Sequence, residues 1–222
     1  MRNRSLHRTV RGRSWLLASL LAAAGSWPAE IPAQASERDE WQRVPEVIAA
    51  LGVGVGSRVA DVGAGSGYFT VHLARSVGAG GGVFAVEIGE REISRLKRLA
   101  EGDSLANIEV VRGEVADPRL PERSLDAVLV VDAYHEMTEH EAMLAGIYRA
   151  LRPGGRLVIL DLVPQDGSAS RDRQTDRHRI GIDMVETEVR AAGYEVLERD
   201  PEFTRTARGR GQWMLVARRP VE

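Results

Sequence analysis

From about residue 36 onward, short apolar runs alternate with segments that have the periodicity of amphipathic helices. The helical period is clearest where Met143, Leu144 and Ile147 fall on one stripe. Strands that alternate with helices indicate an α/β fold, because neighbouring parallel strands are joined by a crossover that is usually helical. The runs predicted to form strands are 58–62, 83–87, 108–112, 127–131, 156–161, 194–198 and 212–217. We therefore expect one domain built on a seven-stranded, mostly parallel sheet.

The first predicted strand ends in a glycine-rich turn, Asp61-Val-Gly63-Ala-Gly65-Ser-Gly67. Glycines at alternate positions adopt positive φ easily and let the backbone approach a ligand closely. Open α/β sheets bind nucleotide-type ligands at the carboxyl ends of their strands. A dinucleotide site would have its third glycine at position 68, where this chain has Tyr68. The spacing therefore disfavours a pyrophosphate cradle.

The turn resembles motif I of class I S-adenosylmethionine-dependent methyltransferases, in which it wraps the methionine part of the cofactor. Weaker matches follow in order over roughly residues 41–217. The resemblance implies a Rossmann-like three-layer sandwich whose last strand is antiparallel. It also implies S-adenosylmethionine as cofactor and methyl transfer to a small-molecule acceptor that the sequence does not identify.

Carboxylates after the second and third predicted strands extend the resemblance. Glu87 lies 20 residues after the last glycine of the turn and matches the acid that binds the ribose hydroxyls. Glu114 matches the acid that contacts the adenine amino group, with Asp117 as its rival, and Val115 would offer a backbone N–H to the ring. The cofactor-binding residues that the resemblance implies are Asp61, Gly63, Gly65, Gly67, Glu87, Glu114, Val115 and Asp132.

The loop after the fourth predicted strand, Asp132-Ala-Tyr134-His135-Glu136, contains the candidate catalytic residue. His135 could act as a general base, because imidazole titrates near neutrality and a base is needed where the acceptor loses a proton. Glu136 could orient it and Tyr134 could line the pocket, whereas a structural or surface His–Glu pair is the alternative. His178 either faces the same pocket or is a solvated loop residue. No metal ligands are predicted.

The first 35 residues have the layout of a secretory signal peptide. Five arginines up to Arg13 precede an apolar run over 15–24, and a helix-breaking segment then leads to Ala35. The run is well short of the roughly 20 residues needed to span a bilayer. We predict a signal peptide over 1–35, the methyltransferase domain over 36–222, and export to the periplasm or medium. An organelle transit peptide, or a misassigned start and hence a cytoplasmic protein, remain the alternatives.

Charge and cysteine content exclude other classes of function. Residues 1–35 carry a net charge of +4, so the rest of the chain accounts for −6 of the total of −2. An acidic domain has no general attraction to nucleic acid or anionic lipid. The chain has no cysteine, which excludes disulfides, thiolate zinc sites and a thiol nucleophile. Two alternatives to the enzyme stay open: a binding module without turnover and a nucleotide-dependent oxidoreductase.

Overall fold

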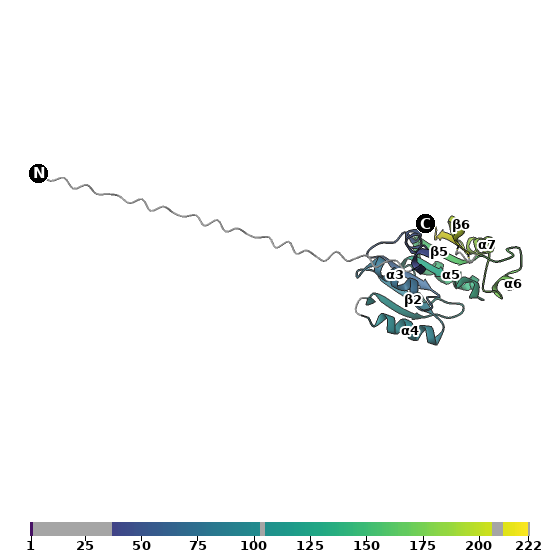
Figure 1. Ribbon diagram of the computed structural model, residues 1–222, viewed down its shortest axis with the longest axis horizontal. Helices are drawn as coiled ribbons and strands as arrows, with labels where there is room; N and C mark the ends of the chain where they lie inside the picture. Colours follow the sequence, from purple (N-terminus) through teal and green to yellow (C-terminus); the bar gives the residue numbers. More distant parts are fainter. Residues whose placement is uncertain (2–36, 103–104, 206–210, 222) are drawn as a thin grey trace. The chain divides into compact units, whose positions relative to one another are not determined.

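The computed structural model describes Met1 and residues 37–102, 105–205 and 211–221, and they confirm the predicted α/β class (Figure 1). The predicted signal peptide falls within residues that lie outside these ranges, apart from Met1. In the described residues, no helix is both long enough and apolar enough to cross a membrane. The helices are α1 (Glu37–Trp41), α2 (Val44–Leu51), α3 (Tyr68–Val77), α4 (Glu90–Ala100), α5 (His140–Ala150), α6 (Arg171–Thr175) and α7 (Ile182–Ala191), with a 3-10 turn η2 (Tyr134–Glu136).

Seven strands form one sheet in the order β3-β2-β1-β4-β5-β7-β6. Strand β7 runs antiparallel to both of its neighbours, β5 and β6, and the remaining pairs are parallel. This confirms the seven-stranded, mostly parallel sheet with an antiparallel last strand. The strands are β1 (Arg58–Val62), β2 (Gly82–Glu87), β3 (Ile108–Arg112), β4 (Leu125–Val131), β5 (Leu151–Leu162), β6 (Glu195–Arg205) and β7 (Gly211–Arg218).

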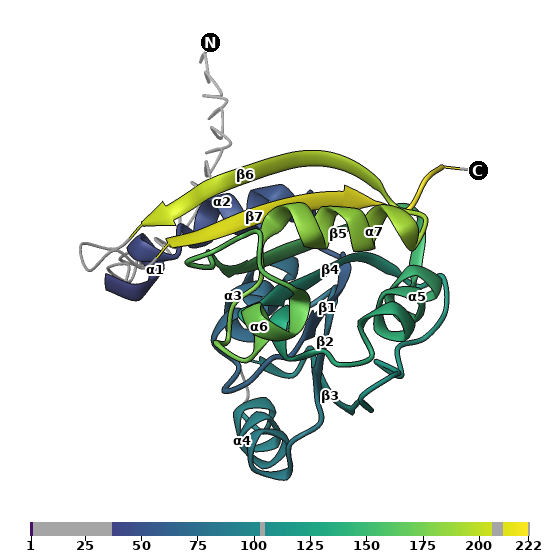
Figure 2. The ribbon, with the colours of Figure 1, turned by 90° about the vertical axis from the view of Figure 1, so that its right-hand side faces the viewer.

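The core is divided into two layers, one on each face of the sheet. Alternate residues of a strand point to opposite faces, and β1 shows this: Val59 packs in the cluster that holds α2, α3 and α4, whereas Ala60 packs with α5 and α7. Both faces are covered, which explains why the strands read as nearly continuous apolar runs. Figure 2 shows α5 and α7 on one side of the sheet and α2 and α3 on the other.

Several elements differ from the sequence-based expectation: α1 was not predicted, and β5 begins at Leu151 instead of residue 156. Strand β6 extends to Arg205 instead of ending near Glu198, because it continues to pair with β7 across two register shifts. Most of its residues are exposed, so no apolar run marks its second half, and Pro201 is tolerated because β6 is an edge strand. Helix α6 was not predicted either, and it lies in a connection rich in Asp, Ser and Arg.

The topology determines where a ligand can bind. Strand β1 lies between β2 and β4, so the chain order reverses beside it. At such a switch point the loops leave in opposite directions and open a crevice at the carboxyl ends of the strands. The turn after β1 and the loop after β4 are therefore adjacent, as the sequence analysis requires of a cofactor site.

Candidate active site

The three glycines of the turn after β1 all have positive φ, but the reasons for glycine differ. A Cβ on Gly63 would lie 2.4 Å from the Cβ of Ala133, and one on Gly67 would lie 2.5 Å from a methyl group of Leu99. These two glycines allow the turn to pack against the loop after β4 and against α4. A Cβ on Gly65, at φ +55°, would meet nothing within 4 Å. Gly65 is therefore the glycine that keeps open the space above the turn.

That space is a cavity of about 410 Å³, within the range of small-molecule sites. It is formed by the loops that follow β1, β2, β3 and β4, and α5 contributes Met143. Of the predicted cofactor-binding residues, six line it: Gly63, Gly65, Glu87, Glu114, Val115 and Asp132. Asp61 and Gly67 are not among its lining residues. The structure thus brings most of the predicted cofactor site together.

The acids after β2 and β3 lie where the sequence analysis placed them. Glu87 is half-buried at the end of β2, and its Oε2 accepts a hydrogen bond of 3.1 Å from the backbone N–H of Ile88. Burial raises the pKa of Glu87, while backbone N–H groups oppose the rise. Glu114 lines the cavity and pairs with Arg119, whereas Asp117 is not a lining residue and caps the turn through the Arg119 N–H. Glu114 is therefore better placed than Asp117.

Asp61 is a buried carboxylate near the end of β1, and Asp132 is a half-buried carboxylate directly after β4. Asp61 accepts a hydrogen bond of 2.6 Å from the hydroxyl of Thr70, which ties β1 to the first turn of α3. Burial raises the pKa of Asp61 to about 6, against the effect of that hydrogen bond. Asp132 has a left-handed φ of +51° and accepts a hydrogen bond of 2.8 Å from Gln212 on β7. Asp61 thus supports the turn through its hydrogen bond with Thr70 and does not line the cavity, whereas Asp132 does.

His135 is 6% exposed and is hydrogen-bonded to Asp161 near the end of β5. Its Nδ1 lies 2.8 Å from Asp161 Oδ1 and 3.1 Å from Oδ2, and its backbone N–H donates to Oδ2 at 3.1 Å. Burial alone would lower the pKa of His135, but the hydrogen bond and charge of Asp161 outweigh it, and the pKa is raised. The imidazole is held in one orientation that leaves Nε2 free of Asp161.

Three predicted roles around His135 need correction or completion. Asp161, rather than Glu136, orients the ring, since Glu136 Oε1 lies 3.7 Å from Nε2. Tyr134 does not line the cavity; it is buried and donates a hydrogen bond of 2.8 Å to Glu188 of α7. His178 has an exposed side chain, yet its ring meets that of His135 edge to face at 5.7 Å. A lone carboxylate in the apolar run of β5 was the signal that could have revealed Asp161.

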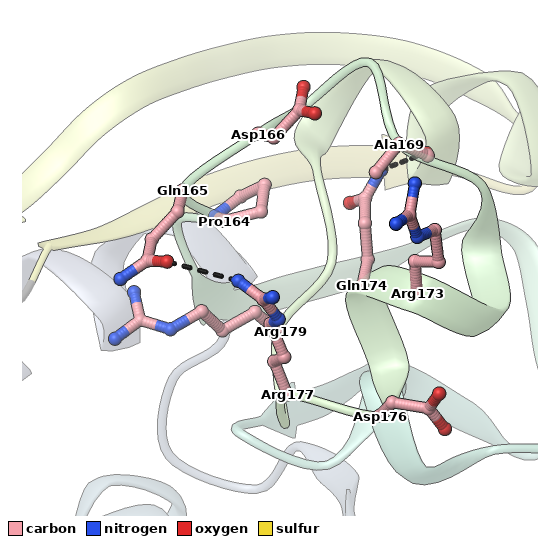
Figure 3. A pocket seen from close by; sticks show the side chains of 9 residues that line it. All are labelled: Pro164, Gln165, Asp166, Ala169, Arg173, Gln174, Asp176, Arg177 and Arg179. Carbon is pink, nitrogen blue, oxygen red and sulfur yellow. Dashed lines mark hydrogen bonds between the residues drawn. The ribbon is translucent and has the colours of Figure 1, made fainter.

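A second cavity of about 280 Å³ lies in the connection between β5 and α7 (Figure 3). Its side chains include Arg173, Arg177 and Arg179, and Figure 3 shows Arg177 hydrogen-bonded to Gln165. The buried side chain of Gln174 braces the same connection through Ala169 and Gly181. The ordering of this connection was not predicted from the sequence.

Comparisons with known proteins agree with this geometry. Residues 59–155 match a family model described as a methyltransferase domain. A ubiquinone/menaquinone biosynthesis C-methyltransferase from Marinomonas sp. is 31% identical over 125 residues, which cover 54% of this chain and 48% of the relative. A demethylmenaquinone methyltransferase from Mycobacterium sp. is 33% identical over 121 residues, which cover 54% and 47%. The chain spans about half the length of the curated relatives it matches.

Solved structures share the fold over most of this chain. An S-adenosylmethionine-dependent methyltransferase from Aquifex aeolicus superposes with a TM-score of 0.70 at 22% identity, covering 82% of this chain and 92% of that one. A [4+2]-cyclase also superposes with a TM-score of 0.70, at 20% identity and 82% coverage of both chains. The fold alone therefore does not determine the reaction. Residues 59–155 thus match a methyltransferase domain, and the fold is shared with a solved S-adenosylmethionine-dependent methyltransferase.

Proposed function

We propose that this protein is an S-adenosylmethionine-dependent methyltransferase that acts on a small-molecule acceptor. The observation that carries the proposal is the charge of the cavity. No lysine or arginine is among the described residues that line it, and five carboxylates are: Glu87, Glu92, Glu114, Asp132 and Glu136. Such a wall suits a ligand with positive charge, because opposite charges attract strongly in a partly desolvated site. A dinucleotide, with an anionic pyrophosphate, would be repelled there.

The lining residues also fit the parts of this cofactor. S-adenosylmethionine, when bound, supplies an electrophilic methyl group on a positively charged sulfur atom. Gly65 leaves the room above the turn that a side chain would take. Glu87, at the end of β2, is placed to accept hydrogen bonds from ribose hydroxyls, and Glu114 and Val115 line the same cavity for the adenine ring. Holding donor and acceptor in line can supply much of the rate of such a transfer.

His135 is our candidate for the acceptor side. Asp161 holds Nδ1, so Nε2 is the ring atom left to take a proton from an acceptor hydroxyl or acidic carbon. Glu136, the next residue, lines the cofactor cavity. His135 is therefore held next to Glu136, a lining residue of the cavity in which we place the donor and beside which we place the acceptor.

Calorimetry on the purified full chain tests the cofactor assignment. We expect saturable binding of S-adenosylhomocysteine and S-adenosylmethionine and none of NAD. Binding of NAD without S-adenosylhomocysteine would favour an oxidoreductase and refute the proposal. Transfer of a tritiated methyl group to small molecules in extracts of the source organism then tests turnover. Cofactor binding without any transfer would favour the binding module.

Export is a separate part of the proposal and rests on the order of basic, apolar and helix-breaking segments in residues 1–35. We expect N-terminal sequencing of the protein isolated from its source to begin at Ser36. A chain that starts at residue 1 and fractionates with the cytosol would contradict export and leave the methyltransferase assignment untouched.

A further inference from the structure

Three side chains from two distant segments meet beside the cofactor cavity: His135 and Glu136 of η2, and His178, which follows α6. One ligand atom from each residue lies within 4.8 Å of the other two. We propose that these three residues form a binding site for a divalent transition-metal ion, with Zn²⁺ as the representative ion. Two imidazoles and one carboxylate are a ligand set that zinc and its first-row neighbours accept, with positions left open for water or substrate.

The distances within this cluster suit a metal better than direct hydrogen bonds. Glu136 Oε1 lies 3.7 Å from His135 Nε2 and 3.8 Å from His178 Nδ1. Hydrogen bonds between these groups would be about 2.7–3.2 Å long. Ligand atoms about 2.1 Å from a tetrahedral ion lie roughly 3.4 Å apart. The cluster is too open for hydrogen-bonded pairs. The two distances from Glu136 exceed the spacing of metal ligands by a few tenths of an ångström, and the two imidazole atoms lie within 4.8 Å of each other.

Asp161 supplies the support that metal-bound histidines usually have. A ligating histidine typically donates its other ring nitrogen to a carboxylate, which fixes the tautomer and ring orientation. Asp161 is 0% exposed and contacts His135 Nδ1 at 2.8 Å and the backbone N–H at 3.1 Å. Nε2, the atom nearest Glu136, is thereby left as the coordinating nitrogen.

The surroundings favour a cation as well. Two carboxylates flank the ring of His135: Asp161 lies 2.8 Å from Nδ1 and Glu136 lies 3.7 Å from Nε2. The two arginines beside His178 have their own partners: Arg177 donates to Gln165 Oε1 at 3.1 Å and Arg179 donates to the carbonyl of Val163 at 2.5 Å. Both line the second cavity of Figure 3. His178 itself has a φ of +53°, a left-handed conformation that is uncommon away from glycine and recurs at functional sites.

The location suggests what such an ion would do. Glu136 is both a proposed ligand and a wall residue of the cofactor cavity. An open coordination position there would bind an oxygen atom of the acceptor, such as a hydroxyl. The ion would lower the pKa of that hydroxyl, which would lose its proton to solvent, because His135 Nε2 would then be bound to the ion and could not act as the base. This role rests on the proposed methyltransferase function. Metal binding does not, and the two can be tested apart.

Metal binding is tested by titrating the untagged, metal-free full chain with Zn²⁺ in a calorimeter and with Co²⁺ by visible absorption. We expect one Zn²⁺ per chain, weak or absent Mg²⁺ binding, and Co²⁺ bands that report nitrogen ligation. His178→Asn removes an exposed ligand and should weaken Zn²⁺ binding roughly 100-fold. Loss of a residue that only hydrogen-bonds to a metal ligand typically weakens metal binding by about 10–100-fold. His72→Asn is the control, because His72 of α3 pairs with Asp39 of α1, outside the cluster; this variant should bind Zn²⁺ as the unaltered chain does.

Two results would overturn the metal site: no saturable Zn²⁺ binding by the folded chain, or equal affinity in the unaltered and His178→Asn proteins. S-adenosylhomocysteine binding is measured on the same samples. In the unaltered chain, S-adenosylhomocysteine binding without Zn²⁺ binding would refute only the metal site. The reverse outcome would refute the cofactor assignment and leave the metal site standing.

Discussion

The two halves of the candidate site are built in different ways. The donor half consists of the turn after β1 and the acids after β2 and β3, and each residue acts near its own strand end. The acceptor half joins His135 to Asp161, 26 residues away, and to His178 beyond α6. Backbone conformation determines the donor half, whereas contacts between distant side chains determine the acceptor half. Substitutions should therefore separate cofactor binding from whatever the acceptor half does.

The largest effect is expected at Gly63. Gly63→Ala places a methyl group 2.4 Å from the Cβ of Ala133 and an alanine at φ +75°. We expect a loss of roughly 2–5 kcal/mol in the free energy of unfolding, from left-handed strain and overpacking together. Denaturant unfolding measures it. The double variant with Ala133→Gly should recover the steric part, and a double variant no more stable than Gly63→Ala would contradict this close packing.

Gly65 tests the donor half without a steric clash in the protein itself. Gly65→Val should weaken S-adenosylhomocysteine binding by roughly 100-fold, about 2.7 kcal/mol, because its side chain enters the cavity. Gly56→Val is the matched control, since Gly56 also has positive φ and open space around its Cβ but does not line the cavity. Both variants place a valine at positive φ, +55° at position 65 and +89° at position 56. Equal losses of affinity in calorimetry would show that strain, not the cavity, is responsible.

Asp61 predicts how stability depends on pH. Its folded pKa of about 6 exceeds the ordinary value of 3.8, so the native state binds the proton more tightly than the unfolded state. The contribution of Asp61 is therefore most favourable below about pH 4 and is lost as the pH rises to about 6. Relative to the unaltered chain, Asp61→Asn should gain roughly 2–3 kcal/mol between pH 4 and 7. Urea unfolding of the ligand-free proteins measures this difference, and a constant difference would contradict the burial of a titrating Asp61.

Substitution of Gln174 tests whether the acceptor half can be destabilised without an effect on the donor half. Its amide donates to Ala169 O at 2.7 Å and accepts from the Gly181 N–H at 2.7 Å. Gln174→Ala should cost about 1–3 kcal/mol, because buried backbone groups lose their partners. Hydrogen exchange should quicken over 167–181 while S-adenosylhomocysteine affinity stays unchanged.

Thr175→Ala is the control for Gln174→Ala. Thr175 is half-buried on the same helix and its hydroxyl donates only to the carbonyl of Asp172 in that helix, so its loss should alter neither quantity. A parallel loss of cofactor affinity in Gln174→Ala would show that the two halves of the site are coupled. The comparison between a donor half and an acceptor half would then fail.

The smallest effect is expected at Glu87. Glu87→Gln keeps the shape of the side chain and removes its charge, so hydrogen bonds from ribose hydroxyls should weaken. We expect roughly tenfold lower S-adenosylhomocysteine affinity, the difference between a charged and a neutral acceptor. Glu90→Gln, an exposed acid paired with Arg112 outside the cavity, should bind normally. Equal affinities for all three proteins would remove Glu87 from the cofactor site.

Much of the donor half could be predicted because its information is local. The run ending at Asp61 predicts a strand, and the alternate glycines predict the turn; Glu87 follows at a set spacing after the next strand. The distinction between the glycines could not be predicted. Which neighbours Gly63 and Gly67 approach depends on how α4 and the loop after β4 pack, which no local pattern encodes.

The sequence alone determined the α/β class, the position of the cofactor turn and the candidate histidine, because periodicity and turn chemistry act over a few residues. Only the tertiary structure decided that Asp161 orients His135, that Tyr134 turns toward Glu188, and that His178 joins Glu136. Those contacts depend on strand order and on the connection after β5. A side chain finds its partner across the sheet through packing of the whole domain, and that information is spread over the entire chain.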